Sequence, residues 1–178
     1  MPSITNRLLF RGLVPGALVF LLSTSVQADR NNYYWLLQAG VMQLALNDAE
    51  ALYTLGSYAG YRISERFSME GEIVKSLKGG FYTSRAGQGH YALSTAAIYG
   101  VLRMALTPSS YLKTKLGVLY ERVEHDSPVD VTLTRSATGF SGGAGLGFVL
   151  FDGLGIELEL NRIEADVLYY SIGVHVSF

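Results

Sequence analysis

An alternation of apolar and polar residues with a period of two constrains the fold of this chain more than any other feature. It is most regular in residues 168–178, which have the sequence LYYSIGVHVSF. Every second residue from Leu168 to Phe178 is apolar, and the residues between them are mostly small or polar. Because successive side chains of a β-strand point to opposite faces, the segment predicts a strand with one apolar face. That face would contact either a soluble core or the acyl chains of a membrane.

The same alternation recurs along the chain, and it predicts eight strands. Beyond residue 28, no segment shows the 3.6-residue apolar spacing of a helix over a useful length. The predicted strands cover residues 33–44, 52–64, 67–78, 90–103, 111–123, 138–151, 154–163 and 167–178. An even number of strands is what an antiparallel transmembrane barrel with both termini on one side requires.

The predicted connections are of two alternating kinds. The tight turns are residues 64–66, 106–110 and 151–153. The other connections are mostly longer and more polar, and they are residues 45–51, 79–89, 124–137 and the short 164–166. Short periplasmic turns that alternate with longer external loops are typical of transmembrane barrels, and a soluble sandwich has no reason to separate its loops by length.

Aromatic residues bracket four of the predicted strands at a separation of eight residues. The pairs are Tyr53 and Tyr61, Tyr91 and Tyr99, Phe140 and Phe148, and Tyr170 and Phe178. An even separation places both members on one face, and eight residues at roughly 3.3 Å each, tilted by roughly 40°, span about 20 Å. That is close to the apolar band of about 25 Å between two aromatic girdles. We therefore predict that these residues, with Trp35 and Phe67, form the girdles.

Ionisable residues gather on the opposite faces of the strands. With the apolar rows outward, nine of them point inward: Arg62, Glu70, Glu72, Lys113, Lys115, Glu121, Glu157, Glu159 and His175. A slip of one residue would move charges into lipid, at about 2–4 kcal/mol for each midplane Lys, so the register is strongly specified. Two pairs of carboxylates lie two residues apart, a spacing that suits acid–base chemistry. Because buried charges must be paired, we interpret the set as a structural polar network instead.

Residues 1–28 have the pattern of a secretory signal peptide. Arg7 and Arg11 precede an apolar run of ten residues, 13–22, and residues 26–28 form a small-x-small cleavage site. Ten residues are too few for a spanning helix, which needs about 20. We therefore expect a signal peptide at residues 1–28, followed by a single outer-membrane β-barrel domain at residues 29–178.

The composition of the expected mature chain excludes some classes of protein. Without the two arginines of the signal, 12 Lys and Arg residues face 15 Asp and Glu residues, a net charge of about −3. A weakly acidic chain without a basic stripe argues against nucleic acid as a partner. The absence of cysteine excludes disulfides and a lipid anchor attached through cysteine.

Four motifs link the chain to a known family. They are the ending of residues 170–178, the YLKTKLGV run of residues 111–118, the glycine-rich SGGAGLG of residues 141–147, and Phe67-x-Met69-Glu70 after a tight turn. With these motifs the whole mature chain resembles the OmpA-like superfamily of eight-stranded outer-membrane barrels. No periplasmic peptidoglycan-binding domain follows Phe178, so that part of the role of the best-known members is not implied.

The resemblance implies an all-β fold, an eight-stranded antiparallel up-and-down transmembrane β-barrel. It also implies Sec-type export to the outer membrane of a Gram-negative bacterium and contact with outer-membrane lipid and lipopolysaccharide. The barrel-assembly machinery would recognise the strand that ends in Phe178. No cofactor and no metal is expected.

The resemblance predicts function less well, because the superfamily includes structural proteins, adhesins and surface-evasion factors. We expect no enzymatic activity and a structural or surface-interaction role, in adhesion or envelope integrity. Phe81, Tyr82 and Arg85 are the candidate contact residues, since such residue types are enriched at binding hot spots. Contact of Lys75, Lys78 and Arg85 with a lipopolysaccharide head group is an alternative.

A lipid A-modifying enzyme is the alternative from another class. Eight-stranded barrels that deacylate lipid A use a His-x-Ser pair with a Glu near the external rim, and His125-Asp126-Ser127 has this spacing. The match departs from the family pattern, because Pro128 follows at once and no Glu occurs between Glu124 and Glu157. His125, Asp126 and Asp130 have a spacing common in polar loops, and we assign no metal to them.

A pore is the third alternative. The interior of an eight-stranded barrel is just wide enough for side chains, whereas aqueous channels have about 16 to 18 strands, so a large diffusion porin is excluded. A narrow pore or small-ligand barrel remains, because small residues line the outer half of the predicted lumen. They are Gly56, Ala92, Ser94, Ala96, Ser141, Gly143, Ser171 and Gly173. They predict either a shallow cavity open to the outside or close backbone packing, in which Tyr58 and Tyr169 fill the volume.

Overall fold

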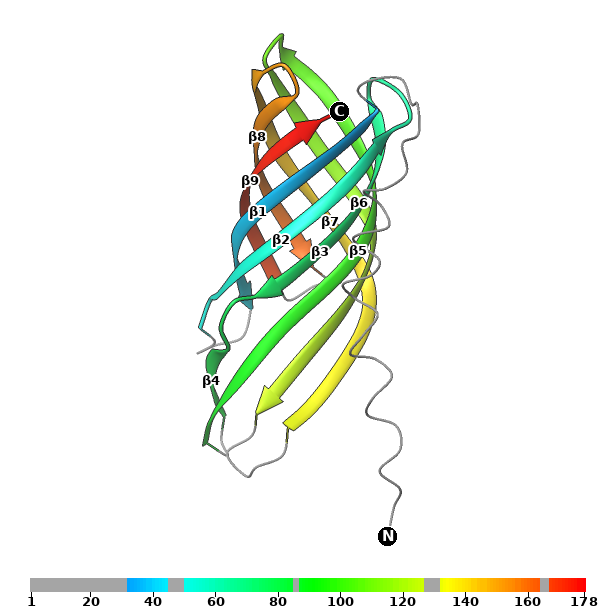
Figure 1. Cartoon of the computed structure of the whole chain (residues 1–178). Helices are drawn as coiled ribbons and strands as arrows, with labels where there is room; N and C mark the ends of the chain where they lie inside the picture. Colours follow the sequence, from blue (N-terminus) through cyan, green and yellow to red (C-terminus); the bar gives the residue numbers. More distant parts are fainter. Residues whose placement is uncertain (1–31, 45–49, 85–86, 127–131, 164–166) are drawn as a thin grey trace.

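The computed structural model describes residues 32–44, 50–84, 87–126, 132–163 and 167–178 (Figure 1). These residues form one antiparallel sheet of nine strand segments. The segments are β1 (Tyr33–Leu44), β2 (Leu52–Arg62), β3 (Phe67–Ser76), β4 (Gly80–Ser84), β5 (Gly87–Thr107), β6 (Ser110–Asp126), β7 (Thr132–Phe151), β8 (Leu154–Ile163) and β9 (Val167–Ser177). Within this part of the chain, no helix is long and apolar enough to span a membrane.

The sheet closes into a barrel of eight strands. Its order is β3-β2-β1-β9-β8-β7-β6-β5-β4, and β3 also pairs with β5. β3 and β4 pair with successive parts of β5, on the same side of it. The two segments therefore count as one strand of the barrel wall. The predicted eight-stranded antiparallel barrel is confirmed. The predicted third strand, residues 67–78, ends at Ser76, and after residues 77–79 the wall continues as β4, in the segment predicted as a loop. Glycine weakens a strand, and Gly79 and Gly80 lie at this interruption.

β5, β6 and β7 are longer than the sequence indicated. They continue through parts of residues 79–89 and 124–137, which were predicted as loops. In Figure 1 these strands extend past the others, at the end opposite the C-terminus. The prediction was wrong there because an extended sheet with both faces in water lacks the apolar row by which the other strands were recognised.

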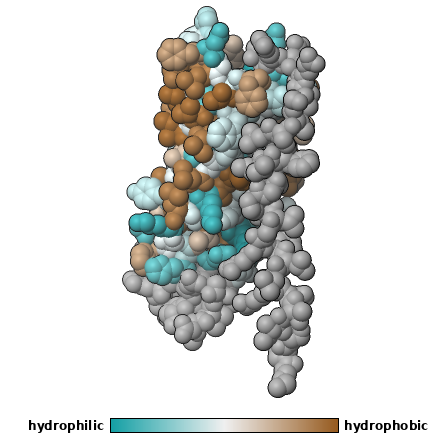
Figure 2. Space-filling model, in the orientation of Figure 1, coloured by the Kyte–Doolittle hydropathy of each residue, from teal (hydrophilic) through white to brown (hydrophobic). Residues whose placement is uncertain are grey.

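The closed wall has a polar zone inside it near the short turns and an apolar zone toward the other end. The apolar zone consists of Met42, Leu52, Val74, Tyr91, Leu93, Leu119, Ile163, Val167 and Tyr169. The same cluster continues into the polar zone with Ala97, Tyr99 and Val101, the cross-strand neighbours of Glu72, Glu70 and Ser68. On the outer wall, apolar side chains gather on the upper part of the face in Figure 2, and hydrophilic ones lie toward the lower end.

Buried tyrosines fill the volume in which a cavity was a hypothesis. Tyr58 and Tyr169 are 1% and 0% exposed. Ala92, Ser94 and Ala96 lie on the outer side of β5, because the buried side chains of that strand are the odd-numbered ones from 91 to 101. In the described part of the chain, the close-packing alternative is therefore the one that the structure adopts.

The register of β5 differs by one residue from the prediction. Tyr91 and Tyr99 are 3% and 1% exposed and point inward, so their assignment to the girdles was wrong. The Tyr99 hydroxyl donates to Ser141 Oγ (3.0 Å), and the outward position beside it is taken by Ile98. The eight other predicted girdle residues are exposed on the outer wall: Trp35, Tyr53, Tyr61, Phe67, Phe140, Phe148, Tyr170 and Phe178.

Inward glycines make room for the tyrosines inside the barrel. A Cβ atom at Gly147 would overlap the ring of Tyr111, whereas a Cβ at Gly71, on the outer wall, would have no other atom within 4 Å. We expect Gly147→Ala to lower the free energy of unfolding by about 1–3 kcal/mol, because overpacking forces side chains off their preferred positions. Gly71→Ala is the matched control and should change it by less than about 0.5 kcal/mol. Denaturant unfolding in detergent, followed by Trp35 fluorescence, measures both, and equal effects would contradict the packing.

Candidate functional site

Six predicted charged residues meet inside the polar zone. Glu70 and Glu72 come from β3, Lys113 and Lys115 from β6, and Glu157 and Glu159 from β8. In each strand the two residues are two positions apart, so both side chains point to the same face. Because β3, β6 and β8 are not neighbours in the sheet, only the closure of the barrel brings these residues together.

Lys113 is the centre of this cluster. Its Nζ atom lies 2.9 Å from Glu70, 2.9 Å from Glu157 and 2.5 Å from Glu159. Lys115 joins Glu159 (2.7 Å) to Glu72 (2.8 Å). Cations and carboxylates therefore alternate across the lumen, and each lysine contacts carboxylates from two strands.

Arg103 is a third cation of the cluster, and it was not among the interior residues predicted from the sequence. Its Nη2 atom lies 3.0 Å from Glu70 and 3.6 Å from Glu157. The error follows from the register of β5, since Arg103 lies on the same face as Tyr99. Arg103 is the one charged residue in residues 91–103. The rule used for the other strands, which places charged residues inside the barrel, would have predicted its position correctly.

Tyrosines add hydrogen bonds to the buried charges, although Glu70 Oε2 has no hydrogen-bond partner among the described residues. The Tyr34 hydroxyl donates to Glu70 (2.7 Å), and the hydroxyls of Tyr58 and Tyr111 donate to Glu157. Lys113 Nζ lies 4.1 Å from the centroid of the Tyr58 ring, a cation–π contact. These side chains supply some of the hydrogen bonds that desolvated charges need.

Three other predicted interior residues lie apart from these six. His175 is buried, with its ring centroid 6.4 Å from that of Tyr111. Arg62 is half-buried at the barrel mouth, where it donates to Ser177 Oγ (3.0 Å). Glu121 is half-buried on β6, beyond the apolar residue Leu119.

The carboxylates and lysines of the cluster are buried, whereas Arg103 and Tyr111 reach the mouth of the barrel, and this limits the chemistry of the cluster. The side chains of Glu70 and Lys113 are 0% and 1% exposed. A carboxylate that acts as a general acid or base must come within hydrogen-bond reach of a substrate. The arrangement matches the pairing that buried charges require, and it can join strands across the lumen.

The strands beyond the polar zone form the second candidate site. β6 pairs with β7 as far as Asp126 and Thr132, whereas the pairing of β7 with β8 ends at Ser141 and Ile163. In the described part of the chain, residues 132–140 therefore have a strand partner on one side only. We refer to residues 132–140 as the free edge of β7.

Of the predicted contact and enzyme residues, Phe81 and the backbones of Tyr82 and His125 lie near this end. Phe81 is 51% exposed on β4, and its ring centroid is 4.3 Å from that of His90. The side chain of Tyr82 and the whole of Arg85 lie outside the described residues. Of the His-x-Ser pair, only the backbone of His125 is described, as part of β6, and Ser127 lies outside the described residues.

Loss of the central cation should destabilise the barrel. Lys113→Met leaves three buried carboxylates without their shared partner, so we expect the free energy of unfolding to fall by about 3–5 kcal/mol. Arg122→Met is the control, because Arg122 pairs with Glu124 (3.0 Å) at 53% side-chain exposure. An exposed pair contributes about 0–1 kcal/mol. Denaturant unfolding in detergent measures both variants, and a Lys113→Met barrel as stable as the control would show that the cluster does not stabilise the fold.

Solved structures with the same fold share little sequence with this chain. Neisserial surface protein A (NspA) has a TM-score of 0.65 at 11% identity, over 85% of this chain and 100% of that one. OprG from Pseudomonas aeruginosa has a TM-score of 0.58 at 14% identity, over 86% and 99%. Ail of Yersinia pestis, in complex with the heparin analogue sucrose octasulfate, has a TM-score of 0.53 at 14% identity, over 82% and 94%. At these identities the likeness shows the fold alone.

The family is shown by the sequence comparison. No curated protein sequence matches the chain significantly. Residues 16–178 match the family described as outer membrane protein beta-barrel domain, and this range includes every described strand. The chain belongs to the outer membrane protein beta-barrel family.

Proposed function

We propose that this protein is a non-catalytic surface-interaction protein of the outer membrane, and that the extended strands form its contact site. The one-sided pairing of residues 132–140 is the observation that carries the proposal. An unpaired strand edge presents a row of backbone N–H and C=O groups, and such edges bind extended segments of other proteins by strand addition. Natural proteins block strand edges with charged residues, above all Lys, with Pro or with a covering element. The segment TLTRSATGF contains neither Lys nor Pro, and Arg135 is its one charged residue.

The orientation in the membrane follows the general arrangement of such barrels, whose short turns are periplasmic. The extended strands then lie outside the cell. The proposal includes export through residues 1–28 as a Sec-type signal peptide, a mature domain of residues 29–178, and recognition of β9 by the barrel-assembly machinery. The exposed aromatic residues would form the two girdles, with Trp35 and Phe67 on the periplasmic side and Tyr53 and Tyr170 on the outer side.

Two further surface groups belong to the same proposal. Phe81, half-exposed on β4, would contact a partner at the outer end, together with Tyr82 and Arg85. Lys75 and Lys78 are exposed, and they would contact the phosphates of lipopolysaccharide head groups. The heparin analogue bound to Ail is compatible with a surface-binding role in a barrel of this fold.

A proline at the free edge tests the contact site. Val149 donates its backbone N–H to Ser109 (2.8 Å), on the β6 side. Since N–H groups point alternately to the two sides of a strand, that of Thr138, an odd number of residues away, points to the free edge. We expect Thr138→Pro to lower adherence of cells displaying the protein to serum-protein-coated and heparin-coated surfaces by about fivefold or more, through the loss of an edge hydrogen bond.

Thr138→Val is the matched control, because it keeps the N–H group and the branched side chain. Both variants should keep the different electrophoretic mobilities of boiled and unboiled samples that mark an intact barrel. Equal adherence of the two variants on both surfaces would contradict strand addition at this edge.

The absence of catalysis is tested on lipid A. Mass spectra of lipid A from cells with and without the protein should be identical, because the buried charged cluster has no access to lipid. If lipid A from cells that contain the protein lacked an acyl chain, the protein would be an enzyme and the proposal would be wrong.

A further inference from the structure

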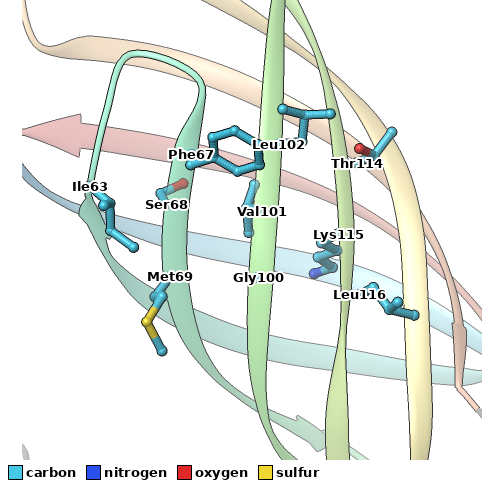
Figure 3. Close-up of a pocket in the computed structure, with 10 residues that line it drawn as sticks. All are labelled: Ile63, Phe67, Ser68, Met69, Gly100, Val101, Leu102, Thr114, Lys115 and Leu116. Carbon is cyan, nitrogen blue, oxygen red and sulfur yellow. The ribbon is translucent and has the colours of Figure 1, made fainter.

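A groove of about 370 Å³ lies on the outer wall of the barrel, over β3, β5 and β6 (Figure 3). Its lining includes the exposed side chains of Phe67, Met69 and Leu116, together with Leu102. Gly100 provides the floor, because its cross-strand neighbours are Met69 on one side and Leu116 on the other. Small-molecule pockets have volumes of about 300–1,000 Å³, so the groove is large enough to hold part of a ligand.

The groove ends at the turn between β2 and β3, at the short-turn end of the barrel. Ile63, at the start of this turn, lines both the groove and the mouth of the barrel. Arg66 in the same turn lines the mouth, and its side chain is exposed. The backbone carbonyl of Arg66 accepts the N–H of Arg103 (2.7 Å), which holds the turn against β5. An apolar groove therefore leads to a turn that carries a guanidinium group.

We propose that this groove binds one acyl chain of a glycerophospholipid of the inner leaflet, with the lipid phosphate beside Arg66. The family of the chain places the outer wall in a bilayer, so the groove is covered by lipid. Inside a bilayer the hydrophobic effect does not favour one apolar contact over another, because lipid tails are as apolar as the wall. The affinity of an acyl chain for the wall therefore comes from van der Waals contacts, and a groove offers more of them than a flat wall.

The charges of the turn match the head group of the proposed ligand. A guanidinium group binds phosphate through two parallel hydrogen bonds. Glu65 precedes Arg66, so the turn has a carboxylate for the ammonium group and a guanidinium for the phosphate of a zwitterionic lipid such as phosphatidylethanolamine. An apolar groove with a charged end suits an amphipathic ligand. A ligand without a phosphate would lack the contact with Arg66 and would bind less well.

Native mass spectrometry of the processed protein tests the proposal, with phosphatidylethanolamine and diacylglycerol added in equal amounts to the detergent solution. We expect an adduct with phosphatidylethanolamine and little with diacylglycerol. Gly100→Leu should lower the adduct about fivefold, because it fills the floor of the groove and removes roughly 1 kcal/mol of packing contacts. Arg66→Gln should lower phosphatidylethanolamine binding to the level of diacylglycerol.

Gly71→Leu is the matched control. It adds the same side chain to the same outer wall, at a position that does not line the groove and where a Cβ has no other atom within 4 Å. At Gly100 the nearest such atom is the Leu116 carbonyl oxygen, at 3.8 Å, so both variants should fold and keep heat-dependent mobility. Adducts that are equal in Gly100→Leu and Gly71→Leu, or diacylglycerol bound as well as phosphatidylethanolamine, would overturn the proposal. A protein dimer lost in Gly100→Leu without any lipid adduct would overturn it in favour of a contact between two copies.

Discussion

The pairing of buried charges across the lumen is the constraint on which the rest of the structure depends. Lys113, on β6, is bonded to carboxylates of β3 and β8, which lie on either side of it in the closed wall but are not its neighbours. A charge buried without a partner is costly, so these bonds favour the one strand register that places all of them inside. The cluster therefore joins parts of the barrel that share no backbone hydrogen bonds.

The small size of the barrel explains why tyrosine and glycine occur together inside it. An eight-stranded interior holds side chains and little else. Tyr34 and Tyr111 lie against Gly60 and Gly147, where a Cβ atom would overlap the rings. The hydroxyls of these tyrosines reach the carboxylates of the cluster, so the glycines indirectly support the ion pairs. Packing and electrostatics are thus satisfied by the same side chains.

The buried charges and the proposed contact site lie in different parts of the molecule. The buried polar cluster lies near the short turns, whereas the free edge of β7 and the exposed Phe81 lie at the opposite end. The apolar zone between them, with Tyr91 and Tyr169, separates the two. The proposed contact site therefore lies away from the buried charges, as is general for function carried by the periphery of a rigid scaffold.

The sequence by itself determined the fold class and the inward face of β3, β6 and β8, because residues 67–73, 112–118 and 154–160 of these strands carry their charges on one row and mostly apolar residues on the other. It did not determine β5, where residues 91–102 have no charge and both rows contain aromatic or apolar residues. Tyr91, Tyr99 and Arg103 were consequently misplaced. It also missed the outer parts of β5, β6 and β7, since a sheet with water on both faces has no apolar row.

Among the described residues, only the tertiary structure decided which charges pair and which strand edge stays unpaired. Lys113 and Glu70 are 43 residues apart in the chain, and they meet because β3 closes the barrel against β5. Local alternation specifies the direction of a side chain but not its partner across the lumen. The partner depends on strand number and stagger, which are properties of the closed sheet as a whole.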